Sequence, residues 1–278
     1  MNTGPILVLT DFSPVADQAL RYAGILAGEL KTSILLLHAQ RMRLDAHALT
    51  GKYPRRSASE AQVLLADRCA IIESGGVPCH SEVVEGDVAK EFAAAVLRHR
   101  AILAVAGKCN TENTPDELVD SITLDLLTRT PCPLLVVPEV YHRFSLPGRV
   151  LVAADRDPVV LGASGTMANE LLRHWRSAVT VARVEPLGSS EWPEATATAE
   201  MIGRTTLLQG IAYVKPLHYS SLEITEGILC AIHSVRADWV VMLARQRSLL
   251  GKLFHRSITT EVVVQSQVPI LVVAESES

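Results

Sequence analysis

The chain has 278 residues, of which 48% are hydrophobic and 20% are charged. This composition indicates a globular protein with a full core and excludes a disordered one. The formal net charge of −4 and the pI near 6.1 argue against the concentrated basic face of a nucleic-acid-binding protein. No apolar run is long enough to cross a bilayer, and the amino-terminal segment has no signal-peptide pattern. We therefore expect a cytoplasmic protein that binds neither nucleic acid nor membrane.

The cysteines give no sign of a disulfide framework or a zinc site. They are odd in number and scattered, at Cys69, Cys79, Cys109, Cys132 and Cys230, and none forms a C-x-x-C pair. We expect free thiols in a reducing compartment.

Short apolar runs alternate with segments of helical periodicity along the first half of the chain. The expected strands are 6–10, 33–38, 79–84, 101–105 and 133–137. The first expected helix begins with Ser13 as the N-cap and Pro14 as the first helical residue. Further helices are expected to end near residue 74 and to span 88–99 and 115–130. This β-α alternation predicts a parallel sheet with helices on both faces and right-handed crossovers.

The second half of the chain repeats the first. The segment ILVLTDFSP at 6–14 aligns without gaps on VLVAADRDP at 150–158, a shift of 144. Residues 133–137 fall on 269–273 with a shift of 136, so the second copy is eight residues shorter in its middle, since 144 − 136 = 8. The repeat predicts two tandem domains, residues 1–140 and 149–278, joined by a short linker at 141–148.

The opening pattern I-L-V-L-T-D-F-S-P-x-A-x-x-A-L-R-Y-A resembles the universal stress protein family. The closing segments TPCPLLVVP and VPILVVA of the two halves are similar to it as well, so the resemblance spans nearly the whole chain. It implies an α/β fold of two tandem doubly wound domains. Each would be a five-stranded parallel sheet in the order 3-2-1-4-5 with helices on both faces, and its ligand crevice would lie at the carboxyl ends of strands 1 and 4.

The resemblance also implies that the domains associate through their last strands. The apolar edges at 134–137 and 270–273 are expected to pair across a pseudo-twofold axis, which makes an internal pseudo-dimer. Whether two chains associate further into a homodimer is left open.

Nucleotide-binding members of the family carry G-x2-G-x9-G-[ST] after strand 4, where glycines let backbone N–H groups approach phosphate. In the first half this register falls on Gly107, Asn110, Asp120 and Ser121, so one glycine and the serine remain. Asp120 would place a carboxylate beside polyphosphate. Two such anions repel by roughly 4 kcal/mol at about 4 Å and an effective dielectric of about 20. The residues thus argue against an ATP cradle.

The second-half register falls on Leu243, Gln246, Arg256 and Ser257 and keeps no glycine. Its leucine and arginine would bring side chains into the space that a phosphate cradle must leave empty. Ser257, like Ser121, could hold a phosphate oxygen or cap the following helix. We therefore expect the nucleotide site to be degenerate in both halves.

Asp11 and Asp155 match the position at the end of strand 1 that contacts adenosine in nucleotide-binding members of the family. Each carboxylate is also typical of a turn or cap after a strand, and both interpretations stay open. A basic loop of the second half, at 245–256, is either an anion-binding segment or a solvated loop.

The sequence shows no positioned general base, nucleophile pair or metal set. It predicts a non-enzymatic, regulatory binding protein of the stress response, without a cofactor and with a protein or small molecule as its partner. One alternative is a switch that binds ATP or AMP in the first crevice. A different one is a sensor of a small anionic or apolar metabolite.

Overall fold

The computed structural model describes residues 4–40, 57–108, 126, 130–154, 160–188, 205–244 and 258–276. The first half contributes the strands β1 (Ile6–Leu9), β2 (Ile34–Gln40), β3 (Cys79–Glu85), β4 (Leu103–Lys108) and β5 (Leu134–Pro138), and the helices α1 (Pro14–Leu30), α2 (Ala58–Ser74) and α3 (Val88–His99). The second half contributes the strands β6 (Arg149–Ala154), β7 (Ala178–Pro186), β8 (Val214–Ser221), β9 (Trp239–Ala244) and β10 (Ile270–Ala274), and the helices α5 (Ala163–His174), α7 (Ile224–Val235) and α9 (Ile258–Gln265).

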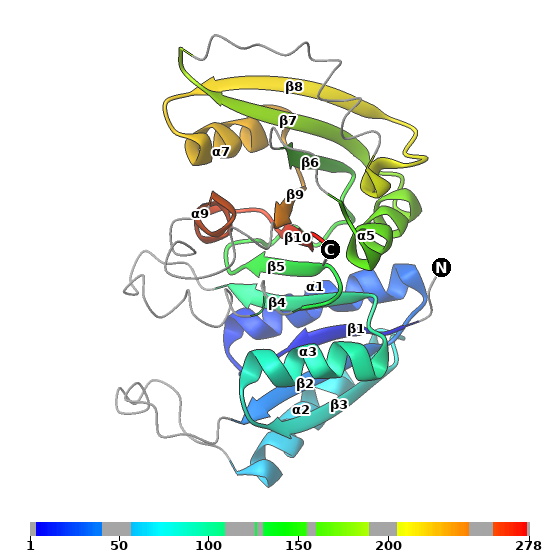
Figure 1. Ribbon diagram of the computed structural model, residues 1–278. Coiled ribbons are helices and arrows are strands. Elements are labelled where there is room, and N and C mark those ends of the chain that lie inside the picture. Colours follow the sequence, from blue (N-terminus) through cyan, green and yellow to red (C-terminus); the bar gives the residue numbers. More distant parts are fainter. Residues whose placement is uncertain are drawn as a thin grey trace.

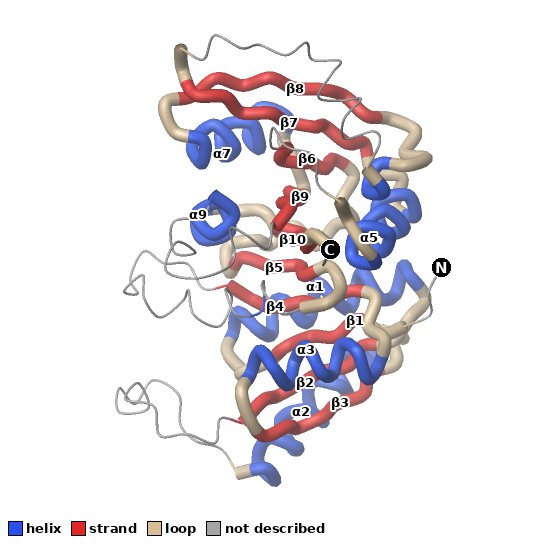
Figure 2. The backbone as a smooth tube through the Cα atoms, in the orientation of Figure 1, coloured by secondary structure: helices blue, strands red, loops and turns tan. Residues whose placement is uncertain are grey.

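These strands form one continuous sheet in the order β3-β2-β1-β4-β5-β10-β9-β6-β7-β8 (Figures 1 and 2). Within each half the strands are parallel and follow the predicted order 3-2-1-4-5. The two last strands, β5 and β10, pair antiparallel at the centre of the sheet. This pairing confirms the predicted association of the halves through their last strands.

The register of the β5–β10 pair is symmetric. Leu134 lies opposite Val272, and Leu135 lies opposite Leu271. Leu135 and Leu271 are equivalent positions of the repeat, because 271 − 135 = 136. A pseudo-twofold axis therefore passes between two buried leucines that are copies of each other.

The structure also locates the length difference between the two halves. The strands β1 and β2 correspond to β6 and β7 with a shift of 144, whereas α3, β4 and β5 correspond to α7, β9 and β10 with a shift of 136. The eight extra residues of the first half therefore lie between β2 and β3, in the part of the chain that contains α2.

The start of α1 follows from its first residues. The Ser13 side chain accepts a hydrogen bond from the Ala16 amide at 3.2 Å, and Pro14 stands at the first helical position. This confirms the predicted cap. The helix α2 begins with a capping box, in which the side chains of Ser57 and Glu60 each bind the other's backbone N–H.

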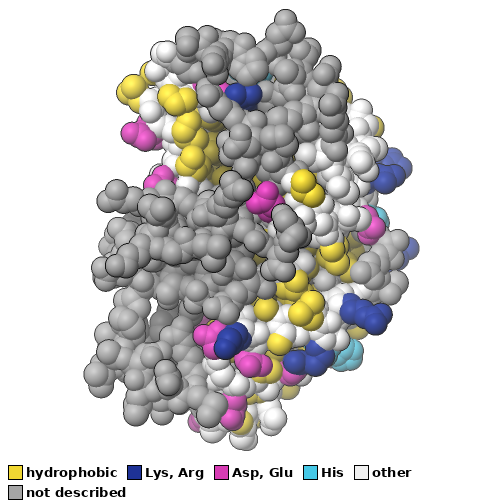
Figure 3. All heavy atoms as spheres, in the orientation of Figure 1, with side chains coloured by type: hydrophobic (Ala, Val, Ile, Leu, Met, Phe, Trp, Pro, Cys, Tyr) yellow, Lys and Arg dark blue, Asp and Glu magenta, His cyan; other side chains and the backbone are white. Residues whose placement is uncertain are grey.

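Both faces of the sheet are covered, so its central strands are buried along most of their length. One apolar cluster packs α1, α2 and α5 against one face, and a second packs α3, α7 and α9 against the other. None of the described helices is long and apolar enough to cross a membrane. On the face in Figure 3, the described Lys and Arg side chains lie apart from one another and make no continuous basic surface.

An aromatic cluster joins the two halves beside the linker. The Tyr22 hydroxyl of α1 accepts a hydrogen bond from Trp239 Nε1 at 2.7 Å and donates one to the Ser145 carbonyl at 2.9 Å. Tyr141 packs edge-on against Tyr22, and Trp175 packs edge-on against Trp239. Burial raises the pKa of Tyr22 well above its usual value, so its hydroxyl stays a donor at neutral pH.

The expectation that all five cysteines are free is wrong for one pair. Cys69 of α2 and Cys79 at the start of β3 form a disulfide with a Cα–Cα distance of 5.1 Å. The chain reverses between them at Gly76, whose φ of 82° suits glycine. The reversal lays the end of α2 beside the first residue of β3. Among the described residues, Cys132 and Cys230 are free thiols, and Cys109 lies outside them.

We expect three titratable thiols in the denatured, unreduced protein, because two of the five cysteines are paired (5 − 2 = 3). A thiol-specific dye should count five after reduction. Reduction should lower the unfolding free energy by about 2–3 kcal/mol, because the disulfide restrains a short loop of the unfolded chain. Cys230→Ser serves as the control and should lose one thiol without losing the effect of reduction. Five thiols before reduction would contradict the disulfide.

Candidate functional site

The strand order reverses at β1, which lies between β2 and β4. In open parallel sheets, ligands bind beyond the carboxyl ends of the strands at such a switch point. The described part of this crevice consists of the loop from β1 to α1, the end of β4 and the neighbouring end of β2.

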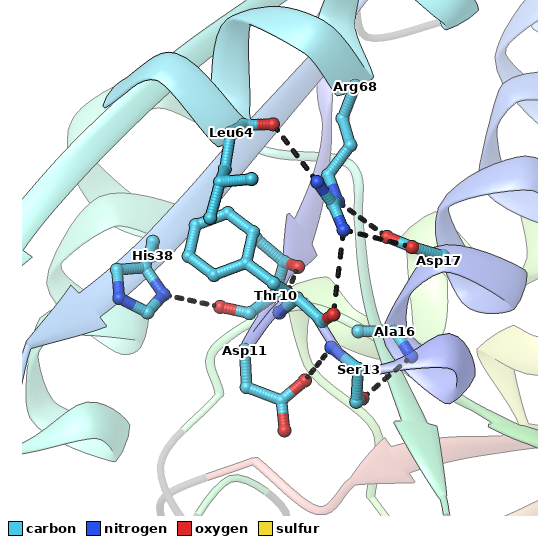
Figure 4. A network of polar contacts seen from close by, with 9 residues as sticks. Thr10, Asp11, Ser13, Ala16, Asp17, His38, Leu64 and Arg68 are labelled. Atoms are coloured by element: carbon cyan, nitrogen blue, oxygen red, sulfur yellow. Dashed lines mark hydrogen bonds and ion pairs between the residues drawn. The ribbon is translucent and has the colours of Figure 1, made fainter. Parts of the chain in front are cut away.

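The loop after β1 binds itself into a tight turn (Figure 4). Asp11 Oδ1 accepts a hydrogen bond from the Ser13 amide at 2.9 Å, and Thr10 Oγ1 accepts one from the Phe12 amide at 3.0 Å. Phe12 has a φ of 67°, the left-handed region that non-glycine residues rarely adopt. The sequence left two roles open for Asp11, turn capping and contact with adenosine. In the structure Asp11 caps the turn.

The unusual backbone at Phe12 turns its ring inward, so that only 8% of the residue is exposed. The ring lies between the His38 imidazole, at 4.5 Å between centroids, and the Arg68 guanidinium, at 5.0 Å from the centroid. His38 Nδ1 lies 2.8 Å from the Thr10 carbonyl oxygen. Because a carbonyl only accepts, this nitrogen carries the proton. His38 is thus a packed strand histidine.

Arg68 fastens the turn to both neighbouring helices. Its Nε and a terminal nitrogen donate to the two carboxylate oxygens of Asp17 at 2.6 and 3.0 Å, a bidentate pair that joins α2 to α1. It also donates to the Leu64 carbonyl at 3.3 Å. Arg68 could not be found as a site residue from the sequence, because it belongs to no motif, and the motif that contains Phe12 does not show the packing of its ring.

Gly107, at the end of β4, is accounted for by packing. A Cβ at this position would lie 2.6 Å from Val15 Cγ1 and 2.7 Å from the Val15 carbonyl oxygen. The first turn of α1 therefore approaches β4 too closely for any side chain. Close packing therefore requires glycine at position 107 whether or not a phosphate binds there. The family resemblance, by contrast, interprets Gly107 as part of a phosphate cradle.

Lys108 follows directly and joins the two halves. Its buried ammonium donates hydrogen bonds to the carbonyl oxygens of Val263 at 2.8 Å, Ser266 at 3.0 Å and Val264. These carbonyls belong to the last turn of α9 and its end, where a positive charge is favoured by the helix dipole. Burial lowers the pKa of Lys108 from 10.5 to about 8. Ala244 occupies the equivalent position in β9, so the second half has no such contact.

The other predicted site residues lie outside the described residues, and their roles stay predictions. They are Asn110, Asp120, Ser121, Asp155, Arg256 and Ser257. The basic loop of the second half falls there too. Within the part of the chain that the structure describes, no group of three or more His, Cys, Asp or Glu residues could hold a metal ion.

Comparison with known proteins supports the resemblance that the sequence shows. The model of the universal stress protein family matches residues 2–138. Universal stress protein Rv2623 of Mycobacterium tuberculosis strain H37Rv is 23% identical over 295 residues, which cover 98% of this chain and 96% of the relative. The chain belongs to the universal stress protein family.

Solved structures of other universal stress proteins share the fold of the whole chain. One from Archaeoglobus fulgidus DSM 4304 has a TM-score of 0.75 at 20% identity and covers 99% of this chain and all of that one. A putative universal stress protein from Pseudomonas aeruginosa UCBPP-PA14 has a TM-score of 0.62 at 17% identity, with 98% and 94% covered. Both halves of the chain are therefore universal-stress-type α/β units.

The packing role of Gly107 predicts that Gly107→Ala is destabilising. The added methyl must push α1 away from β4, which we expect to lower the unfolding free energy by about 1–3 kcal/mol. Gly28→Ala is the matched control, since its Cβ would meet Val77 at 3.5 Å, an ordinary contact, and alanine favours the helix. Urea unfolding measures both. Equal stability of the Gly107 variant and wild type would rule out the packing role.

The buried Lys108 predicts a specific pH dependence. Between about pH 8 and about pH 10.5 the unfolded state binds the Lys108 proton more strongly than the folded state does. The contribution of Lys108 to the unfolding free energy is therefore lowest below pH 8 and rises with pH through this window. We expect the stability difference between wild type and Lys108→Met to shift in favour of wild type as pH rises. Urea unfolding at several pH values measures it, and a flat or opposite trend would contradict the assignment.

Proposed function

We propose that this universal stress protein is a non-enzymatic binding protein of the stress response, whose first crevice does not hold nucleotide polyphosphate. The observation that carries the proposal is that the polar side chains at the carboxyl ends of β1 and β2 form hydrogen bonds with the protein's own backbone. Asp11 binds the Ser13 amide, and His38 binds the Thr10 carbonyl.

The end of β4 supports the same conclusion. Gly107 is needed for the contact of α1 with β4, and Lys108 is committed to the end of α9. Both residues therefore have structural contacts that do not involve a phosphate. The sequence adds Asn110 and Asp120 in place of the two later glycines of the motif, and Asp120 would repel a phosphate.

The polar groups of the described loop also favour binding over catalysis. Ser13 Oγ accepts the Ala16 amide as a helix cap, and the proton-bearing nitrogen of His38 faces a backbone carbonyl. Within this loop the two side chains do not form the nucleophile–base pair that a hydrolase needs. We also propose a cytoplasmic location. Because disulfides are rare in the reducing cytoplasm, the Cys69–Cys79 pair makes this location worth testing in cells.

The second candidate is a switch that binds ATP or AMP in the first half. The retained spacing of Gly107 and Ser121 favours this switch over a metabolite sensor. A sensor of a small metabolite in the remodelled crevice is the third candidate. Native mass spectrometry of protein isolated from its own cells would identify a retained ligand or partner and so distinguish these functions.

Calorimetric titration with ATP and Mg²⁺ tests the degenerate site directly. We expect wild type to show no saturable heat below about 100 µM ATP, a ligand free energy weaker than about −5.5 kcal/mol. Asn110→Gly combined with Asp120→Gly restores the glycine pattern and removes the repelling carboxylate, so we expect it to bind at least about tenfold more tightly.

The matched control combines Asn113→Gly with Asp116→Gly, the same substitutions in the same stretch of sequence but outside the motif. It should bind ATP as weakly as wild type. Micromolar binding of ATP by wild type would overturn the proposal in favour of the nucleotide switch.

A further inference from the structure

A groove of about 550 Å³ lies between three segments around the junction of the two halves. Its walls are the linker at 140–143, the end of α7 and the following turn at 229–238, and the turn at 265–268 between α9 and β10. The last two segments lie at the amino ends of β9 and β10, whereas the crevice of the second half lies at carboxyl ends. The strands β4 and β5 separate the groove from β1 and its loop. It is therefore a different site from either crevice.

The groove combines an apolar surface with cationic side chains. Its apolar part is formed by Val140, Leu229, Ile232, Ala237 and Val268. Two guanidinium groups and two imidazoles also line it, from Arg143, Arg236, His142 and His233. A volume of this size lies within the range of sites for small organic ligands, roughly 300–1,000 Å³.

The negative groups beside the groove already have partners. Asp238, the carboxylate in its lining, accepts the Arg149 amide at 2.8 Å and pairs with the guanidinium groups of Arg149 at 3.3 Å and Arg143 at 3.5 Å. The carbonyls at the end of α9 are bound by Lys108. Within the lining, Asp238 therefore balances Arg143, and among the described residues no acidic side chain of the groove pairs with Arg236.

The remaining guanidinium and the two imidazoles are open to a ligand. Among the described residues, the side chains of His142, His233 and Arg236 form no hydrogen bond or ion pair with one another or with their neighbours. A guanidinium can bind two oxygens of a carboxylate or phosphate at once. Arg236 and His233 both line the groove, His233 from the last turn of α7 and Arg236 from its C-cap.

The equivalent positions of the first half do not carry this combination. In the repeat, Arg236 corresponds to Arg100, but His233 corresponds to Leu97, an apolar side chain that is 67% exposed. The linker wall has no counterpart in the first half, because the chain has a single linker. The groove is thus a product of the tandem arrangement.

We propose that this groove binds a small organic anion, in which a carboxylate or phosphate group on an apolar body meets Arg236 and His233. The apolar body then covers Leu229 and Val268, which are only half-buried in the free protein, and gains the free energy of their burial. The anionic group supplies the partner that the guanidinium lacks.

Phenyl phosphate is a suitable probe, because it joins a phosphate to a compact apolar ring, and benzoate is the carboxylate arm. In two-dimensional NMR spectra of the ¹⁵N-labelled chain we expect saturable shifts at the amides of His233, Arg236 and Gln267. Comparison of the two probes shows which anion the groove prefers. Inorganic phosphate and phenol, each alone, should bind at least about tenfold more weakly, because each offers half of the contact.

Arg236→Asn should weaken phenyl phosphate binding at least about tenfold, as expected for loss of a charge-assisted hydrogen bond. Arg100→Asn is the matched control, since both arginines end a helix in the left-handed region with a φ of 52°, which asparagine tolerates. It should leave binding unchanged. His233→Gln is a second variant that does not alter this backbone, and it should weaken binding as well.

The proposal is overturned by any of three results. The first is absence of saturation with both phenyl phosphate and benzoate up to about 10 mM, which means a binding free energy weaker than about −3 kcal/mol. The second is equal weakening by the Arg100 and Arg236 variants. The third is inorganic phosphate binding as tightly as phenyl phosphate.

Discussion

The antiparallel pairing of β5 with β10 is the contact on which the rest of the architecture depends. Each half alone would expose a short apolar edge strand with unpaired backbone groups, a surface prone to aggregation. Pairing the two edges satisfies those groups and joins ten strands into one sheet. It also determines which residues meet across the junction. Tyr22 reaches Trp239, and Lys108 reaches the end of α9, because β5 and β10 bring their elements together.

The junction is symmetric in its backbone but not in its side chains. Leu135 faces its copy Leu271 across the pseudo-twofold axis. Lys108, by contrast, has Ala244 as its counterpart, and His233 has Leu97. The first half therefore supplies a buried cation to the second from a position where the second half has alanine, and the second half has a histidine beside the linker where the first has leucine. The symmetric backbone keeps the halves together, while the asymmetric side chains give each half its own chemistry.

Patterns that repeat or act locally could be predicted from the sequence. The shifts of 144 and 136 located the first and last strands of the second half, and Ser13 with Pro14 located the start of α1. Contacts between distant residues could not be predicted in this way. The packing role of Gly107 depends on the position of Val15, and the partners of Lys108 lie about 155 residues away along the chain. The disulfide depends on how α2 returns onto β3, which the spacing of two cysteines does not show.

The linker that closes the groove also determines how the two halves find each other. Two separate chains with unlike edges would form a mixture of like and unlike pairs, in proportions set by their concentrations. A tether of a few residues keeps each β5 at an effective concentration of about millimolar or higher beside its own β10. Each half is therefore produced together with one unlike partner in a fixed one-to-one ratio. In a homodimer, a substitution appears in both subunits and must suit both sides of the pair. In the tandem chain it appears in one half only, so the two halves are free to diverge.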